Sequence, residues 1–190
     1  MQKTAGMFFW RRVDGPGHDS CRLFRLADGW RLAGAAVFRE AGRPCHFNYE
    51  VSVDGEWRTR SAKISGFLGR KEIDIRVRSA GVGRWKVDGV SLDGVKGCVD
   101  VDLNFTPATN MIALRRLSLK VGQHAEAPAA WLKFPAMRFM RLPQSYRRIS
   151  RNEYAYEAPT TGYSGILEVS SSGAVIRYPG LFEQVASRRS

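Results

Sequence analysis

The chain has 190 residues, of which 44% are hydrophobic and 11% aromatic, so it can bury a sizeable core without disulfide bonds or metals. This composition argues against intrinsic disorder, and the length fits one domain spanning residues 1–190. A formal net charge of +12 favours anionic partners without identifying one.

No targeting or membrane-spanning segment is predicted. The apolar run from Met7 to Trp10 is shorter than the hydrophobic stretch of a signal peptide, and no run of about 20 apolar residues occurs. The cysteines, Cys21, Cys45 and Cys98, are far apart and form no CxxC pair, so neither a disulfide framework nor a zinc site is indicated. We therefore expect a cytoplasmic protein without a cofactor.

Alternation of apolar and polar residues with a period of two dominates the chain and predicts strands with one buried and one exposed face. It is clearest in residues 45–53 and 72–78. Helical periodicity is poor, and the best short candidates are residues 106–111 and 180–187. In chain order, strands are expected near residues 7–13, 20–27, 30–39, 44–53, 56–66, 71–78, 84–88, 97–104, 113–120, 129–140, 145–157, 163–170 and 174–179.

Turn residues support this pattern. Asp-Gly pairs at residues 28–29, 54–55 and 88–89 each separate two β-rich runs, which is a strong hairpin signal. Consecutive hairpins on this scale leave a sandwich, a closed barrel or an incompletely closed barrel as the architecture. The sequence therefore predicts an all-β, mostly antiparallel fold with few short helices, whose curved sheet could enclose a ligand cavity.

The most distinctive stretch is residues 97–110. Alternation places Asp100 and Asp102 on one face of a strand, about 6.6–6.8 Å apart. That spacing overlaps the carboxylate separation of inverting glycosidases, so hydrolysis of a glycosyl or lipid ester bond is an alternative function. A ligand-facing or structural polar network, or a solvated strand face, explains the same pattern. In the turn that follows, Thr109 and Asn110 could offer hydroxyl and amide groups to a sugar-like headgroup.

Aromatic and basic residues supply further candidates. Arg115 and Arg116 fall on opposite faces of the strand expected at 113–120, so one of them is placed to meet Asp100 or Asp102. Tryptophan and tyrosine combine an apolar ring with one polar group, which suits a pocket for an acyl chain and a polar head, although core filling is the more ordinary role for any one of them. The large aromatics that punctuate the strands are Trp10, Trp30, Trp57, Trp85, Trp131, Tyr146, Tyr154 and Tyr156.

Common catalytic signatures are absent from the sequence, which contains no GxSxG elbow, HExxH motif or P-loop. His18, His46 and His124 lack metal-ligand spacing, so no metal site is predicted, and the His18-Asp19 pair is expected in a surface loop. Anion or nucleic-acid binding is a third hypothesis, because the chain is basic with interleaved aromatics. No RNP-like or helix-turn-helix pattern supports it.

Residues 97–102, followed by 106–110 and 115–117, resemble the central signature of a bacterial glycolipid-binding family. The resemblance covers nearly the whole chain. One departure is Met111-Ile112-Ala113, which replaces a Thr-Leu-Pro-like run and loses a proline. The other matching segments are Trp10, residues 17–26, 57–59, 131–135 and 144–146, and Tyr154 and Tyr156.

This resemblance implies a curved antiparallel half-barrel, similar to the bacterial carriers that shuttle lipoproteins and shelter acyl chains in their concavity. We therefore expect a binding or carrier protein for an amphipathic ligand such as a glycolipid, rather than an enzyme, with transient contact to a membrane surface allowed. The candidate ligand-binding residues are Arg58, Asp100, Asp102, Thr109, Asn110, Arg115, Trp57, Tyr146 and Tyr154.

Overall fold

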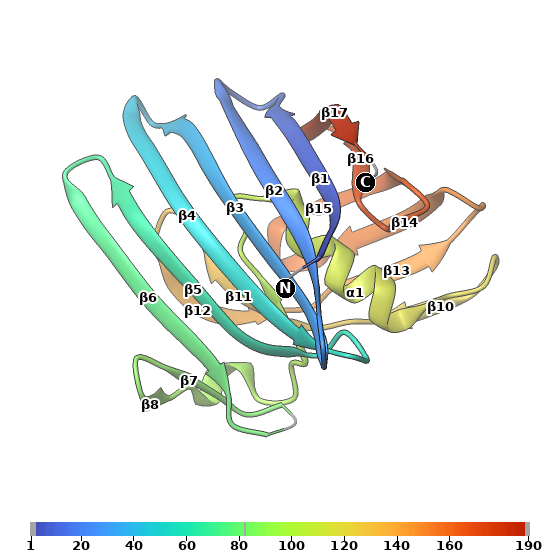
Figure 1. The fold of residues 1–190 in the computed structure, drawn as a ribbon, viewed down its shortest axis with the longest axis horizontal. Coiled ribbons are helices and arrows are strands. Elements are labelled where there is room, and N and C mark those ends of the chain that lie inside the picture. The colour runs from blue at the N-terminus through green and yellow to red at the C-terminus, as the bar shows by residue number, and fades with distance from the viewer. Residues whose placement is uncertain (1–2, 82, 189–190) are drawn as a thin grey trace.

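A computed structural model describes residues 3–81 and 83–188 of the chain. Its main element is a curved antiparallel sheet of 14 strands (Figure 1), in the order β10-β13-β14-β15-β16-β17-β1-β2-β3-β4-β5-β6-β7-β8. The sheet does not close, because β8 and β10 remain its two edges. A second sheet has three strands in the order β12-β11-β9, with β9 and β11 parallel. The predicted all-β, mostly antiparallel fold is confirmed.

The strands are β1 (Lys3–Arg12), β2 (Gly17–Leu26), β3 (Gly29–Glu40), β4 (Arg43–Asp54), β5 (Thr59–Leu68), β6 (Lys71–Ser79), β7 (Trp85–Val87), β8 (Val90–Ser91), β9 (Asp100–Asp102), β10 (His124–Glu126), β11 (Ala129–Lys133), β12 (Arg138–Leu142), β13 (Ser145–Arg148), β14 (Glu153–Ala158), β15 (Tyr163–Val169), β16 (Val175–Tyr178) and β17 (Phe182–Arg188). The helices are α1 (Asn110–Leu117) and the short 3₁₀ turns η1 (Asp93–Val95), η2 (Pro107–Thr109) and η3 (Pro159–Thr161).

Hairpin chemistry and alternation account for the long strands. In β4, every second side chain from Cys45 to Val53 is buried and points to the core. The three Asp-Gly pairs stand at the β2–β3, β4–β5 and β7–β8 connections, as predicted. At the first of these, Gly29 has φ +155° and a side chain there would meet the carbonyl oxygen of Val53 at 2.1 Å, so only glycine fits the turn.

Two segments have a different structure from the one expected. Residues 113–120, expected as a strand, lie largely in α1, and residues 180–187, expected as a helix, lie largely in β17. Met111, Ile112 and Leu114 of α1 are all buried, so the helix is held by core packing that outweighs its weak amphipathic pattern. In the described part of the chain, no helix is long and apolar enough to cross a membrane.

Three predicted strands are shorter or divided. The segment 97–104 contributes only the three residues of β9, because Asn104 takes a left-handed conformation with φ +60° and turns the chain. The segment 129–140 is the hairpin β11–β12, and the segment 145–157 is the hairpin β13–β14. The 106–111 candidate holds η2 and the start of α1, where Thr106 Oγ1 accepts a hydrogen bond from the N–H of Ala108 at 3.0 Å.

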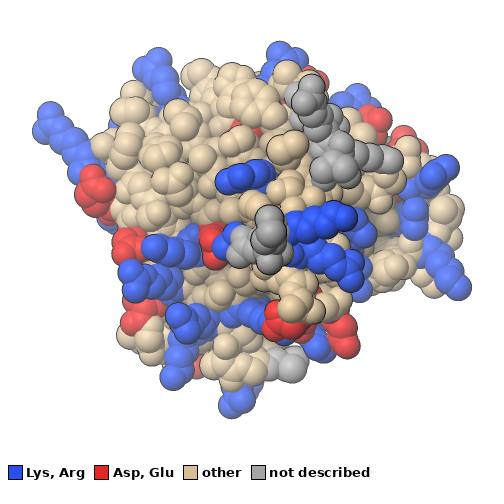
Figure 2. Space-filling view, viewed as in Figure 1, with Lys and Arg blue, Asp and Glu red and all other residues tan. Residues whose placement is uncertain are grey.

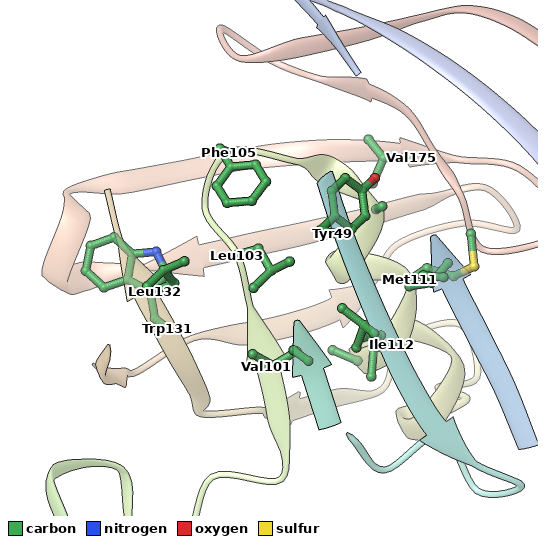
Figure 3. Packing of buried hydrophobic residues seen from close by; sticks show 14 of the residues in the cluster. Tyr49, Val101, Leu103, Phe105, Met111, Ile112, Trp131, Leu132 and Val175 are labelled. Atoms are coloured by element: carbon green, nitrogen blue, oxygen red, sulfur yellow. The ribbon is translucent and has the colours of Figure 1, made fainter. Parts of the chain in front are cut away.

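The concave side of the main sheet is filled by an inner layer, which consists of the continuous segment from β9 through η2 to α1, together with β11 and β12. This layer contacts β5 on one side and β16 on the other. Figure 3 shows its side chains Leu103 and Phe105 packed in the interior beside Tyr49 of β4. The ring of Phe105 lies 4.8 Å from that of Phe47 and 6.0 Å from that of Tyr49, centre to centre. The expected shelter for an acyl chain is therefore largely occupied by protein.

Truncation of the inner layer should cost much of the stability. Leu103 is 0% exposed, so Leu103→Ala should lower the free energy of unfolding by about 2–5 kcal/mol through lost burial and a residual cavity. Val90 is 72% exposed, so Val90→Ala should change the free energy of unfolding by less than about 0.5 kcal/mol. Urea unfolding of both variants measures the difference. Equal effects would mean that the inner layer does not pack as described.

Candidate functional site

A pocket of about 230 Å³ remains between the inner layer and strands β14–β17, and we call it the tyrosine pocket. The inner layer contributes its polar side, and the main sheet contributes aromatic rings. Asn104 and Thr161 are exposed, so the pocket opens to solvent. Its lining comprises Asp102, Asn104, Thr106, Asn110, Trp131, Leu142, Tyr156, Ala158, Thr161, Tyr163, Tyr178, Leu181 and Phe182.

Asp102 is the charged group of the tyrosine pocket. Its Oδ1 accepts a hydrogen bond of 2.7 Å from the backbone N–H of Asn104, which the left-handed turn at that residue directs back to the carboxylate. Burial raises the pKa of Asp102 to about 6, and this backbone hydrogen bond opposes the rise. No lysine, arginine or histidine among the described residues forms an ion pair with it. The carboxylate therefore keeps acceptor capacity for a ligand.

Tyrosine rings form the wall opposite Asp102. The ring of Tyr156 lies 5.8 Å from both Tyr163 and Tyr178, centre to centre, and 4.8 Å from Tyr146. The Tyr156 hydroxyl donates a hydrogen bond of 2.7 Å to Gln144 Oε1, which fixes the ring. Burial raises the pKa of Tyr156 and of Tyr178 far above the usual value, so both phenols keep their protons and remain hydrogen-bond donors.

Asn110 is the second polar group that the inner layer presents to the pocket. It begins α1, and its Nδ2 donates a hydrogen bond of 3.1 Å to the hydroxyl of Tyr146, which is 0% exposed. Thr109, one residue earlier, is also buried, but its Oγ1 accepts a long hydrogen bond of 3.4 Å from the N–H of Leu103. Tyr146 and Thr109 thus support the site from behind and do not line it.

Asp100 has a structural partner. Arg116 donates two hydrogen bonds to its carboxylate, from Nε at 2.8 Å and from Nη2 at 2.6 Å. Burial raises the pKa of Asp100, and the arginine opposes that shift. The expectation that one of the two neighbouring arginines meets Asp100 or Asp102 is met by Arg116, although from a helix. Only Asp102 of the two carboxylates lines the tyrosine pocket.

The remaining sequence candidates lie elsewhere. Arg58 is exposed and pairs with Asp54 and Glu56 in the β4–β5 turn. Trp57, Arg115 and Tyr154 line a separate cleft of about 400 Å³. The structure therefore brings Asp102 and Asn110 together in the tyrosine pocket and places Asp100, Thr109 and Tyr146 behind them. The other four candidates lie away from this pocket.

Several pocket residues carry no sequence signal of their own. Tyr163 and Tyr178 lie in strands that were predicted, but nothing in the pattern indicates that they meet. Asn104 could have been predicted as a pocket residue from the sequence, because it lies in the distinctive stretch 97–110, two residues after Asp102. Among the described residues, no group of three or more histidine, cysteine, aspartate or glutamate side chains could hold a metal ion.

Another buried carboxyl, that of Asp19, lies next to the pocket. Asp19, expected in a surface loop, is 1% exposed in β2 and accepts hydrogen bonds from the hydroxyls of Tyr49 and Thr106. The loop prediction for Asp19 is wrong, because the strand turns this side chain toward the core. Burial raises the pKa of Asp19 to about 7. Since Thr106 also lines the tyrosine pocket, Asp19 fixes part of its wall.

The raised pKa of Asp19 should make stability fall as pH rises. The folded state holds this proton to about pH 7, whereas the unfolded state releases it near 3.8. The stabilisation is complete below about pH 4 and is lost through pH 7, at no more than about 1.4 kcal/mol per pH unit. The raised pKa of Asp102 also makes stability fall as pH rises, up to about pH 6. Urea unfolding of Asp19→Asn should therefore show a flatter profile between pH 6 and 7.5; an unchanged slope there would contradict the assignment.

Comparisons with known proteins give a consistent result. A family model described as "Putative glycolipid-binding" matches residues 7–184. The crystal structure of a DUF1089 family protein from Pseudomonas aeruginosa is similar to this chain, with a TM-score of 0.78 and 30% sequence identity. The similarity covers 87% of this chain and 90% of that protein. None of the curated proteins compared with the chain matches it.

Proposed function

This chain belongs to the family described as "Putative glycolipid-binding", and on that premise we propose that it binds an amphipathic ligand through a polar headgroup in the tyrosine pocket. One observation carries the proposal. The Asp102 carboxylate lies without an ion-pair partner among the described residues, at a solvent-open pocket walled by tyrosine rings. A small aromatic pocket with a few placed polar groups is the usual form of a small-molecule site.

The chemistry of the pocket fits a polyhydroxylated ring. A carboxylate accepts strong, charge-assisted hydrogen bonds from hydroxyl groups. The Asn110 side chain keeps its carbonyl oxygen as an acceptor while its nitrogen bonds Tyr146. Tyrosine faces offer apolar contact to ring C–H groups, whereas the hydroxyls of Tyr156 and Tyr163 already donate to Gln144 and to the carbonyl oxygen of Pro179. A sugar headgroup combines both kinds of surface, so it is the ligand that we favour.

The size of the pocket sets a limit on what it encloses. At about 230 Å³ it lies below the range of about 300–1,000 Å³ that is typical of sites for drug-sized ligands. It is suited to a headgroup and not to a headgroup with its full acyl chain. Leu142, Leu181 and Phe182 add an apolar part to the lining, along which we expect the first carbons of the tail to leave.

The wider cellular role belongs to the same proposal. A carrier that acts in the cytoplasm and touches a membrane surface transiently would need no disulfide bonds, and Cys21, Cys45 and Cys98 are all free and buried.

The rival hydrolase requires two carboxylates at the substrate, whereas Asp100 is held by Arg116. Nucleic-acid binding requires basic residues clustered in a patch or stripe. On the face shown in Figure 2, the basic residues are instead dispersed, with acidic residues between them.

Removal of the pocket charge should weaken headgroup binding. Asp102→Asn keeps the shape of the side chain but loses charge-assisted acceptance, so affinity for short-chain alkyl glycosides below micelle formation should fall roughly tenfold or more. Isothermal titration calorimetry with glucosyl, galactosyl and mannosyl probes measures this effect. Asp93→Asn, at an exposed aspartate outside the tyrosine pocket, serves as the matched control and should bind like the wild type.

Two results would contradict the proposal. One is equal affinity of the wild type and the Asp102→Asn variant for a glycoside that binds. The other is a wild-type protein that binds none of the three probes.

A further inference from the structure

A second cleft lies beside the C-terminal end of α1, and we call it the arginine cleft. It has a volume of about 400 Å³, and no lining residue is shared with the tyrosine pocket. Its walls come from α1 and from the turns that follow β4, β13 and β15. Three arginines face it, namely Arg115, Arg148 and Arg151, and none of the described residues that line it is aspartate or glutamate. The cleft therefore carries a concentrated positive charge.

Arg115 is the arginine that α1 contributes to the cleft. Its Nε donates a hydrogen bond of 2.7 Å to the carbonyl oxygen of Ser172, and its guanidinium lies 5.3 Å from the ring centre of Trp57. A side chain at Gly173 would come within 3.3 Å of this Nε, so the glycine leaves room for the arginine. No ion pair between Arg115 and a carboxylate is found in the described part of the chain. A half-buried cation without a counter-ion is costly, and a bound anion would offset that cost.

Arg148 builds the floor of the cleft. Its three guanidinium nitrogens donate to the carbonyl oxygens of Ser150, Leu119 and Arg151, at 3.2, 2.7 and 2.9 Å. These hydrogen bonds fix the β13–β14 turn and hold the backbone of Arg151, whose own side chain is exposed. The negative end of α1 offsets only about half a unit charge. The excess of positive charge therefore remains in the cleft.

Trp57 gives the cleft an aromatic wall at a cost in backbone strain. It has φ +64°, a left-handed conformation that is unfavourable for a bulky residue. Asp54 Oδ1 holds this turn by accepting hydrogen bonds from the N–H groups of Glu56 and Arg58, at 3.0 and 2.9 Å. The indole stacks on Trp30 at 5.3 Å between ring centres and meets Arg115 as well. The strained turn thus orients the guanidinium before any ligand arrives.

We propose that the arginine cleft binds the phosphate group of a phosphate ester. Guanidinium groups match phosphate oxygens with paired hydrogen bonds, and the free ends of Arg115 and Arg151 are available for that role. The cleft is larger than a phosphate, and Trp57 and Tyr154 provide surface for the attached organic group. Because the two sites share no lining residue, this inference holds whether or not the tyrosine pocket binds a sugar.

Binding of phosphate probes at constant ionic strength tests the inference. Inorganic phosphate, glycerol 3-phosphate, and vesicles of phosphatidylglycerol are titrated against the full chain, with phosphatidylcholine vesicles as the neutral reference. Arg115→Gln and Arg151→Gln should each weaken binding roughly tenfold or more. Arg138→Gln removes an exposed arginine of β12 outside the cleft and should leave binding unchanged. Arg151 is exposed, so its variant stays informative if Arg115→Gln fails to fold.

The outcomes separate the sources of phosphate. If the wild type binds the soluble phosphates and both cleft variants bind them more weakly, the ligand is a free phosphate ester. If the wild type binds only the phosphatidylglycerol vesicles and both variants weaken that binding, the ligand is a lipid headgroup. Equal weakening by Arg138→Gln would show attraction by net charge only and would overturn the assignment. Absence of binding to every phosphate probe would overturn it as well.

Discussion

An ion pair between the buried Asp100 and the partly buried Arg116 joins β9 to α1 and so fixes the inner layer on which both sites depend. Two residues beyond Asp100, the same short strand presents Asp102 to the tyrosine pocket. One residue before Arg116, the helix turns Arg115 in another direction, toward the arginine cleft. Loss of Arg116 would leave the buried carboxylate of Asp100 without its counter-ion, so the structure requires this contact.

The helix α1 therefore serves two sites with its two ends. Asn110 at its start lines the tyrosine pocket, and Arg115 in its last turn lines the arginine cleft. Between them, Met111, Ile112 and Leu114 are buried in the core. The inner layer thus replaces an open concavity by a small polar pocket on one side and a basic cleft on the other. This arrangement supports the proposal that the polar part of a ligand is bound while its tail is left outside.

Sequence reasoning succeeded where the signal is local. Alternation and Asp-Gly turns predicted the main sheet, because strand periodicity and hairpin chemistry are properties of neighbouring residues. The distinctive stretch also contained Asp102 and Asn110, which do meet in one pocket. The inner layer could not be predicted in this way. Its β9 has three residues and pairs in parallel with β11, far along the chain, and α1 is stabilised by burial instead of by its own periodicity. Asp19 was misplaced for a similar reason, since its partners Tyr49 and Thr106 come from distant segments.

We propose that the protein binds the headgroup of its ligand and does not enclose the tail. Titration calorimetry with hexyl, octyl and decyl glycosides of the same sugar, all as monomers, tests it most directly. Affinity should change little with chain length, because the described interior is filled by the inner layer. An enclosed tail would instead gain about 0.8 kcal/mol, or about fourfold in affinity, for each added CH₂ group. A rise of that size across the series would show that the protein encloses the tail.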